Sequence, residues 1–156
     1  MQLNATTCYA MQIVLYLARN KRIVSSAELA ESLKVSQRYT LKIAGLLRDG
    51  GLTDVQAGMR GGYSLTREAS EISAYDVITL MEGEMSILEC LTPNPDCGEA
   101  CKNTHQLSAL GIVKDYLDAF LKRLTFDKLA DMGISEKLDG IIGLAESHIE
   151  SILGSA

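Results

Sequence analysis

The chain has 156 residues, of which 47% are hydrophobic and 22% are charged, values that fit a folded globular protein and exclude a disordered chain. Its net charge of −5 is unevenly distributed. Residues 1–67 carry nine Lys and Arg against four Asp and Glu, a net +5, whereas residues 68–156 carry six against sixteen, a net −10. The basic N-terminal part is therefore expected to face an acidic partner such as nucleic acid.

No leader or membrane segment is expected. The first seven residues contain no basic side chain, and the apolar run at residues 13–18 is too short to span a bilayer and ends at Arg19. We therefore expect a cytoplasmic protein. In that compartment the four cysteines are expected to be reduced, metal-bound or redox-active rather than joined in structural disulfides.

A first helix is predicted from a cap at Thr6 or Thr7 to about Asn20. Apolar residues at helical spacing form its core face: Ala10, Ile13, Val14, Leu17 and Ala18. Cys8 falls in the first turn of this helix. Spacing alone favours Cys8 as a small buried apolar residue rather than a ligand, because free cysteine is among the most buried residue types.

Residues 25–67 are predicted to form a winged helix-turn-helix. Ser25 and Glu28 have the spacing of a capping box, and a turn at Lys34 leads to Ser36, which is a good cap for a second helix. The apolar side of that second helix consists of Tyr39, Ile43, Leu46 and Leu47. Glycines at 50 and 51 end the helix, and residues 52–55 and 63–65 are predicted to pair as a β-hairpin.

Such a unit presents the polar face of its second helix to the DNA major groove and its wing to the backbone or the minor groove. Arg60 stands at the predicted tip of the wing. Basic side chains on both helix and wing suit phosphate contact. The candidate DNA-binding residues are Ser36, Gln37, Arg38, Thr40, Lys42 and Arg60. The alternative is a winged helix used only for protein contacts.

A short helix is predicted to start at Ser73, with Asp76 completing a capping box, and to end at Gly83. Three cysteines follow at Cys90, Cys97 and Cys101, with two prolines and a glycine between them. Proline and glycine interrupt regular structure, so this segment is expected to be a loop that gathers three soft ligands.

Several chemistries fit these cysteines. Thiolates suit an iron–sulfur cluster, but Cys90, Cys97 and Cys101 together with His105 would also complete a tetrahedral zinc site. A metal-free switch, in which two of the loop cysteines form a disulfide, is a third possibility. An enzyme is not expected, because no third group orients a Cys101–His105 pair and no phosphate or cofactor loop is present.

Residues 103–124 are predicted to form a long helix. Its apolar residues recur at intervals of 3, 4, 3 and 4, the spacing of a coiled-coil seam: Leu110, Val113, Leu117, Phe120 and Leu124. The seam is expected to pair with a second copy of the chain, although packing on the chain's own core is the alternative. A homodimer would place two recognition helices on half-sites about 34 Å apart. A last helix is predicted over residues 135–153.

These elements predict a mainly α fold with a small β wing. The expected division is a winged helix-turn-helix domain over residues 1–84, a cysteine-containing loop over 85–102, and a dimerisation helix with a C-terminal helical segment over 103–156. The expected partners are double-stranded DNA and a second copy of the chain, with no membrane contact.

The chain resembles the Rrf2 family of winged-helix repressors and activators, which includes IscR, NsrR, RirA and CymR. The resemblance covers roughly residues 1–130. It rests on Tyr16–Ala18 in the first helix, Arg60–Leu65 in the wing, the run from Ala74 to Gly83, and three cysteines before a long helix.

The resemblance implies a homodimeric transcription regulator whose Cys90, Cys97 and Cys101 hold an iron–sulfur cluster, with 4Fe–4S favoured over 2Fe–2S. The fourth ligand differs among members, and in some it comes from the start of the first helix of the other subunit, where Cys8 stands here. We therefore expect Cys8 as the fourth ligand, with His105, which lies close to Cys101 in the sequence, as the alternative. Two departures stand out. The cysteine spacing is compact, and Leu41 occupies a recognition-helix position that is acidic in some members.

Overall fold

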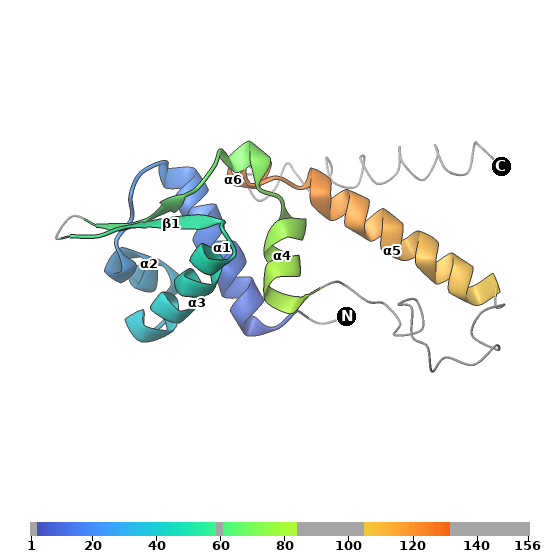
Figure 1. The fold of residues 1–156 in the computed structure, drawn as a ribbon, viewed down its shortest axis with the longest axis horizontal. Helices are drawn as coiled ribbons and strands as arrows, with labels where there is room; N and C mark the ends of the chain where they lie inside the picture. Colours follow the sequence, from blue (N-terminus) through green and yellow to red (C-terminus); the bar gives the residue numbers. More distant parts are fainter. Residues whose placement is uncertain (1–2, 59–60, 84–104, 132–156) are drawn as a thin grey trace.

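The computed structural model describes residues 3–58, 61–83 and 105–131 (Figure 1). In these ranges the elements are α1 (Ala5–Asn20), α2 (Ser26–Leu33), α3 (Gln37–Asp49), β1 (Thr53–Gln56), β2 (Gly62–Leu65), the 3₁₀ turn η1 (Ala69–Glu71), α4 (Ala74–Glu82), α5 (His105–Arg123) and α6 (Phe126–Asp131). The predicted mainly α fold with a small β wing is confirmed. The helix predicted over 135–153 lies outside the described residues.

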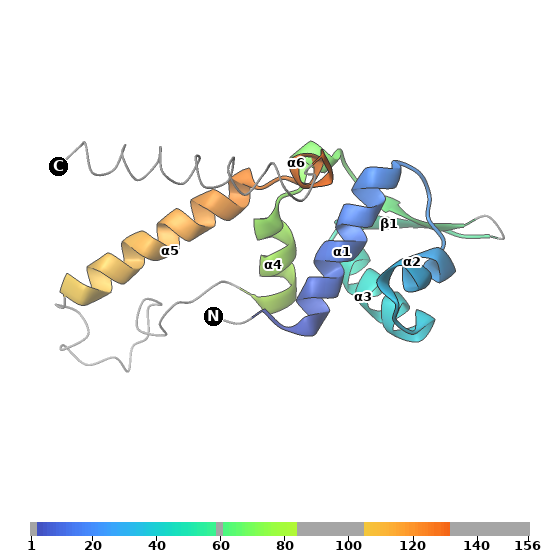
Figure 2. The same ribbon diagram turned by 180° about the vertical axis from the view of Figure 1, so that it is seen from behind.

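Helix α1 occupies the centre of the unit, between α4 and the α2–α3 pair (Figure 2). All five residues of the predicted core face are buried. The helix begins earlier than expected, because Asn4 is its cap and the Asn4 Oδ1 atom accepts the Thr7 backbone N–H at 2.8 Å. Asn4 takes an extended conformation, and its short side chain satisfies an N–H that the helix leaves unpaired.

The helix-turn-helix forms as predicted, with one difference at its first cap. Ser25 Oγ accepts the Glu28 N–H at 3.2 Å, but the Glu28 carboxylate does not return to Ser25. It accepts hydrogen bonds from the Arg22 guanidinium and the Tyr16 hydroxyl instead. These contacts lower the pKa of Glu28, the Arg22 bond most strongly. The predicted capping box is therefore only half formed, because the carboxylate ties α2 to α1.

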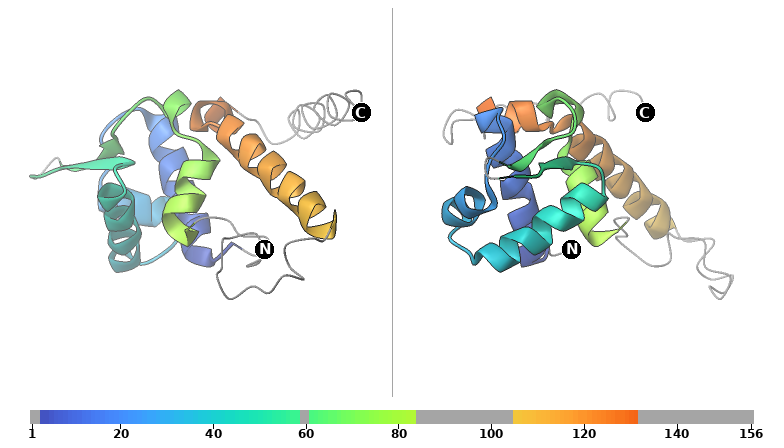
Figure 3. Two further views of the ribbon diagram at one scale, coloured as in Figure 1. Left: turned by 45° about the vertical axis from the view of Figure 1, so that its right-hand side comes forward. Right: turned by 60° about the vertical axis from the view of Figure 1, so that its left-hand side comes forward.

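The wing is a two-stranded antiparallel hairpin in which Thr53 pairs with Leu65 and Gln56 with Gly62. Val24 adds a short bridge on the other side of β2, exchanging two backbone hydrogen bonds of 2.8 and 2.9 Å with Tyr63. A Cβ on Gly62 would lie 2.2 Å from the Val24 carbonyl oxygen, so this close approach requires glycine. The hairpin projects away from the helices (Figure 3).

The chain returns to the winged unit after α5. Ala74 N–H donates to the Leu124 carbonyl at 2.8 Å, and Phe126 N–H donates to the Ile72 carbonyl at 2.9 Å. Helix α6 packs against α1 and η1, with the Phe126 side chain completely buried. The domain division stays a prediction. Helix α6, which lies within the segment 103–156, contributes Phe126 to the core of the winged unit.

Helix α5 extends beyond the unit (Figure 1), and the side chains described as packing with α4 belong to its C-terminal half. Leu117, Phe120 and Leu124 are partly buried against a small cluster formed by Ala74 and Ile78 of α4 and Leu121 of α5. The alternative of packing on the chain's own core therefore holds in part for these three residues, and pairing of the seam with a second copy stays a prediction. Ile112 and Val113 remain 61% and 52% exposed.

Candidate nucleic-acid interface and metal centre

One face of α3 is exposed and the opposite face is buried. Ile43, Ala44 and Leu47 are completely buried, whereas Arg38 and Lys42, one helical turn apart, are exposed. The Ser36 cap starts the helix by accepting the Tyr39 N–H at 3.3 Å. The helix lies at the surface of the unit, near the base of the projecting hairpin (Figure 3).

Two cations on this face are available for a ligand. Among the described residues, neither Arg38 nor Lys42 has an ion-pair partner. Arg48, near the other end of α3, is paired with the neighbouring Asp49 at 2.7 Å. The unpaired positive charge of the helix is thus concentrated in its first half.

Gln37 and Ser36 lie at the start of the same face. Both are exposed, and Gln37 Nε2 donates to Ser26 Oγ at 2.9 Å, which joins the first turn of α3 to the first turn of α2. These two residues therefore have structural roles, as a cap and as an inter-helix link, in addition to their exposed position.

The prediction that Thr40 contacts DNA is wrong. The Thr40 side chain is completely buried, and its hydroxyl donates to the Ser36 carbonyl at 3.2 Å, so it is not available to contact DNA. Leu46, predicted to lie on the apolar side, is 41% exposed, because the buried strip of α3 is narrow and consists of Thr40, Ile43, Ala44 and Leu47. Leu41 adds a second exposed leucine to the outer surface of the helix.

Arg60 lies outside the described residues, and the glycine that follows it, Gly61, donates its N–H to the Gly58 carbonyl at 2.9 Å. A Cβ on Gly61 would meet the Gln56 carbonyl oxygen at 2.1 Å. Glycine is therefore needed where the chain turns back into β2.

The predicted metal ligands are described only in part. Cys90, Cys97 and Cys101 lie outside the described residues, and of His105 only its place as the first residue of α5 is described. Cys8 is exposed, so the expectation from spacing that it is buried is wrong. No group of three or more His, Cys, Asp or Glu within the described ranges could hold a metal ion.

The first turn of α1, which carries Cys8, adjoins the end of α4. Asn4 N–H donates to Glu82 Oε1 at 3.0 Å, and the Thr7 hydroxyl donates to the same oxygen. These bonds lower the pKa of Glu82, the Thr7 hydroxyl contributing most. The exposed thiol thus lies next to Thr7, which is bonded to the last residue of α4, shortly before the segment with the other three cysteines.

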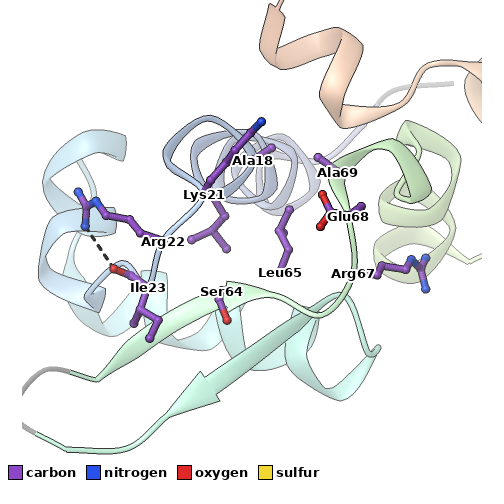
Figure 4. Close-up of a pocket in the computed structure, with 10 residues that line it drawn as sticks. Ala18, Lys21, Arg22, Ile23, Ser64, Leu65, Arg67, Glu68 and Ala69 are labelled. Carbon is purple, nitrogen blue, oxygen red and sulfur yellow. Dashed lines mark hydrogen bonds between the residues drawn. The ribbon is translucent and has the colours of Figure 1, made fainter.

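A pocket of about 330 Å³ lies between the end of α1 and β2. Lys21, Arg22 and Arg67 are among its lining residues, but Figure 4 shows the charged groups of Arg22 and Arg67 directed away from it. Arg22 is paired with Glu28, and Arg67 Nε donates to the Glu71 carbonyl at 3.2 Å. These two cations are therefore engaged outside the pocket, and we assign no ligand to it.

The helix-turn-helix, its β wing and the unpaired cations on α3 define the class of winged-helix DNA-binding proteins. Within that class, the family model described as "Iron-dependent Transcriptional regulator", Rrf2, matches residues 3–132, and the chain belongs to this family. The resemblance drawn from the sequence is confirmed.

Individual relatives agree with the family. A putative HTH-type transcriptional regulator, YffB of Lactococcus lactis, is 35% identical over 138 residues, which is 84% of this chain and 88% of the relative. The HTH-type transcriptional regulator NsrR of Shouchella clausii is 25% identical over 87% of this chain and 91% of its own length. The solved structure of CymR, the global cysteine regulator of B. subtilis, matches with a TM-score of 0.69 at 25% identity and covers 83% of this chain and 96% of that one.

The chain is a transcriptional regulator of the Rrf2 type. The relatives are named as regulators and not as enzymes, in agreement with the sequence. No helix in the described ranges is long and apolar enough to cross a membrane.

Proposed function

We propose that this regulator binds double-stranded DNA as a homodimer and senses iron, redox state or nitric oxide through an iron–sulfur cluster held by Cys90, Cys97 and Cys101. The observation that carries the sensing proposal is the exposed Cys8 thiol, beside the end of the helix that precedes those cysteines. A family described as iron-dependent supports the same chemistry.

DNA recognition is assigned to the exposed face of α3 and to the wing. Lys42 and Arg60 contact phosphates, where a positive charge strengthens binding without reading sequence. Arg38, nearer the helix start, contacts a base edge in the major groove. Ser36 and Gln37 support this end of the helix, and Thr40 acts only from within, through its bond to the Ser36 carbonyl.

The cluster is proposed to be 4Fe–4S, with Cys8 of the other subunit as the fourth ligand and His105 as the alternative. Thiolates are the usual ligands of such clusters, and an exposed cysteine is accessible to one. When bound, the cluster supplies one-electron redox chemistry and a target for oxidants and nitric oxide. The residues of this chain hold it and link it to the DNA-binding unit.

The homodimer is proposed to form through the N-terminal half of α5, which contains Ile112 and Val113. Ile112 and Val113 are large apolar side chains left exposed on a helix that extends beyond the winged unit (Figure 1). Exposed apolar surface of this kind is typical of an interaction site. Pairing through α5 would give the two recognition helices the fixed separation that a two-fold symmetric operator requires.

A DNA titration tests the function. Protein reconstituted anaerobically with iron and sulfide is compared with the same protein after chelator treatment, using genomic fragments selected by the protein itself. We expect the two forms to differ in affinity for the selected fragments. Equal affinities of the two forms, together with a spectrum that proves cluster loading, would contradict sensing through the cluster.

The fourth ligand is tested by Cys8→Ala and His105→Ala. We expect Cys8→Ala to alter the cluster spectrum, shorten the cluster lifetime and change the DNA affinity, while His105→Ala behaves like the parent. If Cys8→Ala matches the parent in all three measurements, Cys8 is not a ligand.

A further inference from the structure

Three helices meet at the first turn of α1, and consecutive threonines there bond to different neighbours. Thr6 Oγ1 lies 3.0 Å from the Tyr39 hydroxyl on α3. Thr7 Oγ1 donates to Glu82 on α4, which also accepts the Asn4 N–H at 3.0 Å. One rigid helical turn therefore joins the end of α4 to the recognition helix.

Tyr39 anchors the DNA-facing end of α3. It lies in the first turn of that helix, directly after Arg38, and is partly buried against the core. Its ring contacts Tyr9 edge to face, with centroids 5.7 Å apart. The Tyr39 hydroxyl and ring together fix how the start of α3 lies against α1.

Glu82 is the corresponding anchor on α4. It is the last residue of that helix, and only Gly83 separates it from the segment 84–104 that carries three cysteines. Its carboxylate accepts from the capping residue Asn4 and from Thr7, so it holds the N-terminal turn of α1 at two points. A negative charge at a helix N-terminus also complements the helix dipole.

We propose that Glu82, Thr6 and Tyr39 are positioning residues of a hydrogen-bonded relay that couples the end of α4 to the DNA-facing turn of α3. As a signal route, the relay rests on the proposed sensing function. Displacement of Glu82 would release the first turn of α1, and through Thr6 and Tyr39 it would loosen the end of α3 that carries Arg38. Such a coupling needs contiguous contacts between elements that can take two arrangements.

The relay is separable from the stability of the fold. Helix α1 is held in the core by completely buried side chains, among them Ala10, Ile13 and Val14. The relay bonds lie toward the edge of the unit, where Glu82 is exposed and Thr6 and Tyr39 are only partly buried, although Thr7 itself is completely buried. Removing one of them is therefore expected to change local order more than global unfolding.

Hydrogen exchange of the full-length protein tests the coupling without requiring a cluster. We expect Glu82→Gln to raise amide exchange at residues 37–41 about five-fold, the effect of losing one ordinary hydrogen bond. Matched controls are Glu71→Gln, an exposed glutamate on η1, and Tyr9→Phe, which keeps the ring contact with Tyr39. Both controls are expected to exchange like the parent.

A double variant shows whether the effect passes through Tyr39. In a Tyr39→Phe background, Glu82→Gln should no longer change exchange in α3, because the link to Thr6 is already absent. Thermal unfolding verifies that each variant remains folded at the exchange temperature. Parent-like exchange in α3 of Glu82→Gln, or an undiminished effect of Glu82→Gln in the Tyr39→Phe background, would overturn the relay.

DNA affinity of the reconstituted and stripped proteins separates the relay from the proposed function. If the parent shows a cluster-dependent ratio of affinities, Glu82→Gln and Tyr39→Phe should reduce that ratio by at least about three-fold. Retention of the full ratio in both variants would overturn the relay. If the reconstituted and stripped parent proteins bind DNA with equal affinity, the proposed sensing fails, and the exchange measurements alone decide whether the relay exists.

Discussion

Replacing Lys42 by alanine removes one positive charge from the exposed face of α3 and leaves the fold intact. The Lys42 side chain is exposed and has no ion-pair partner among the described residues, and alanine is a good helix former. The change therefore isolates one proposed phosphate contact per subunit.

The size of the effect follows from counterion release. Each phosphate contact contributes about 0.9 to the slope of log affinity against log salt concentration. A homodimer presents Lys42 twice, so the slope is expected to fall by about 1.8 in the variant. Between about 50 and about 200 mM salt, the ratio of parent to variant affinity should then shrink about twelve-fold. A monomeric complex would give only about a 3.5-fold change over the same range.

Fluorescence anisotropy at four salt concentrations measures the slope, on an operator and on an unrelated duplex. We expect the loss to be similar on both DNAs, because a phosphate contact carries no sequence information. Lys128→Ala, at an exposed lysine on α6, is the matched control and should keep the slope of the parent. An unchanged slope in Lys42→Ala would refute the docking of α3 on DNA.

Three further predictions concern stability and assembly. Phe126→Ala should lower the free energy of unfolding by about 3–5 kcal/mol in a denaturant titration, because it empties a completely buried site between α6 and α1; a loss below about 1 kcal/mol would contradict that packing. Val113→Asp should convert the homodimer to a folded monomer in sedimentation. The variant buries an unpaired charge in the proposed interface, which weakens the free energy of association by several kcal/mol; a persisting dimer would place the interface elsewhere. Folding lowers the pKa of Glu82, so the ionised carboxylate stabilises the folded state. This contribution is complete above the ordinary pKa of 4.5 and is lost as pH falls through the lower folded-state pKa. Parent and Glu82→Gln should thus differ in thermal stability at pH 7 and converge in acid, and a difference that persists in acid would exclude this carboxylate as the cause.

Local signals predicted most of the element boundaries. The caps Ser25, Ser36 and Ser73 start α2, α3 and α4 as expected, because each serine bonds an N–H three residues along the chain. The start of α1 was misplaced. Asn4 and Thr7 are both competent caps, and Glu82, 75 residues from Thr7, engages the Thr7 hydroxyl and leaves the capping role to Asn4.

Tertiary contacts decided what the sequence pattern left open. Phe126 lies in a helix of only six residues, too short to show a period, and its burial depends on the return of the chain from α5 to α1. The heptad spacing of residues 110–124 indicates an apolar stripe but does not specify its partner. Here α4 covers part of Leu117, Phe120 and Leu124.

The candidate site was predicted in part. Arg38 and Lys42 are exposed as the helical pattern indicated, whereas Thr40 turns inward and bonds to the Ser36 carbonyl. The exposure of Cys8 was available from the sequence, since the buried stripe of α1 passes through Ala10, Ile13, Val14 and Leu17 and leaves position 8 outside it. The position of Cys8 relative to the buried face of α1 therefore predicts its exposure better than the average burial of cysteine does.

The most direct test of iron–sulfur sensing is the visible absorption spectrum of anaerobically purified protein, with iron and sulfide analysis of the same sample. A 4Fe–4S cluster held by Cys90, Cys97 and Cys101 predicts a brown protein with iron and sulfide in equal amounts, and loss of the colour in Cys97→Ala. A colourless parent protein, with zinc or with no metal after anaerobic purification and reconstitution, would contradict it.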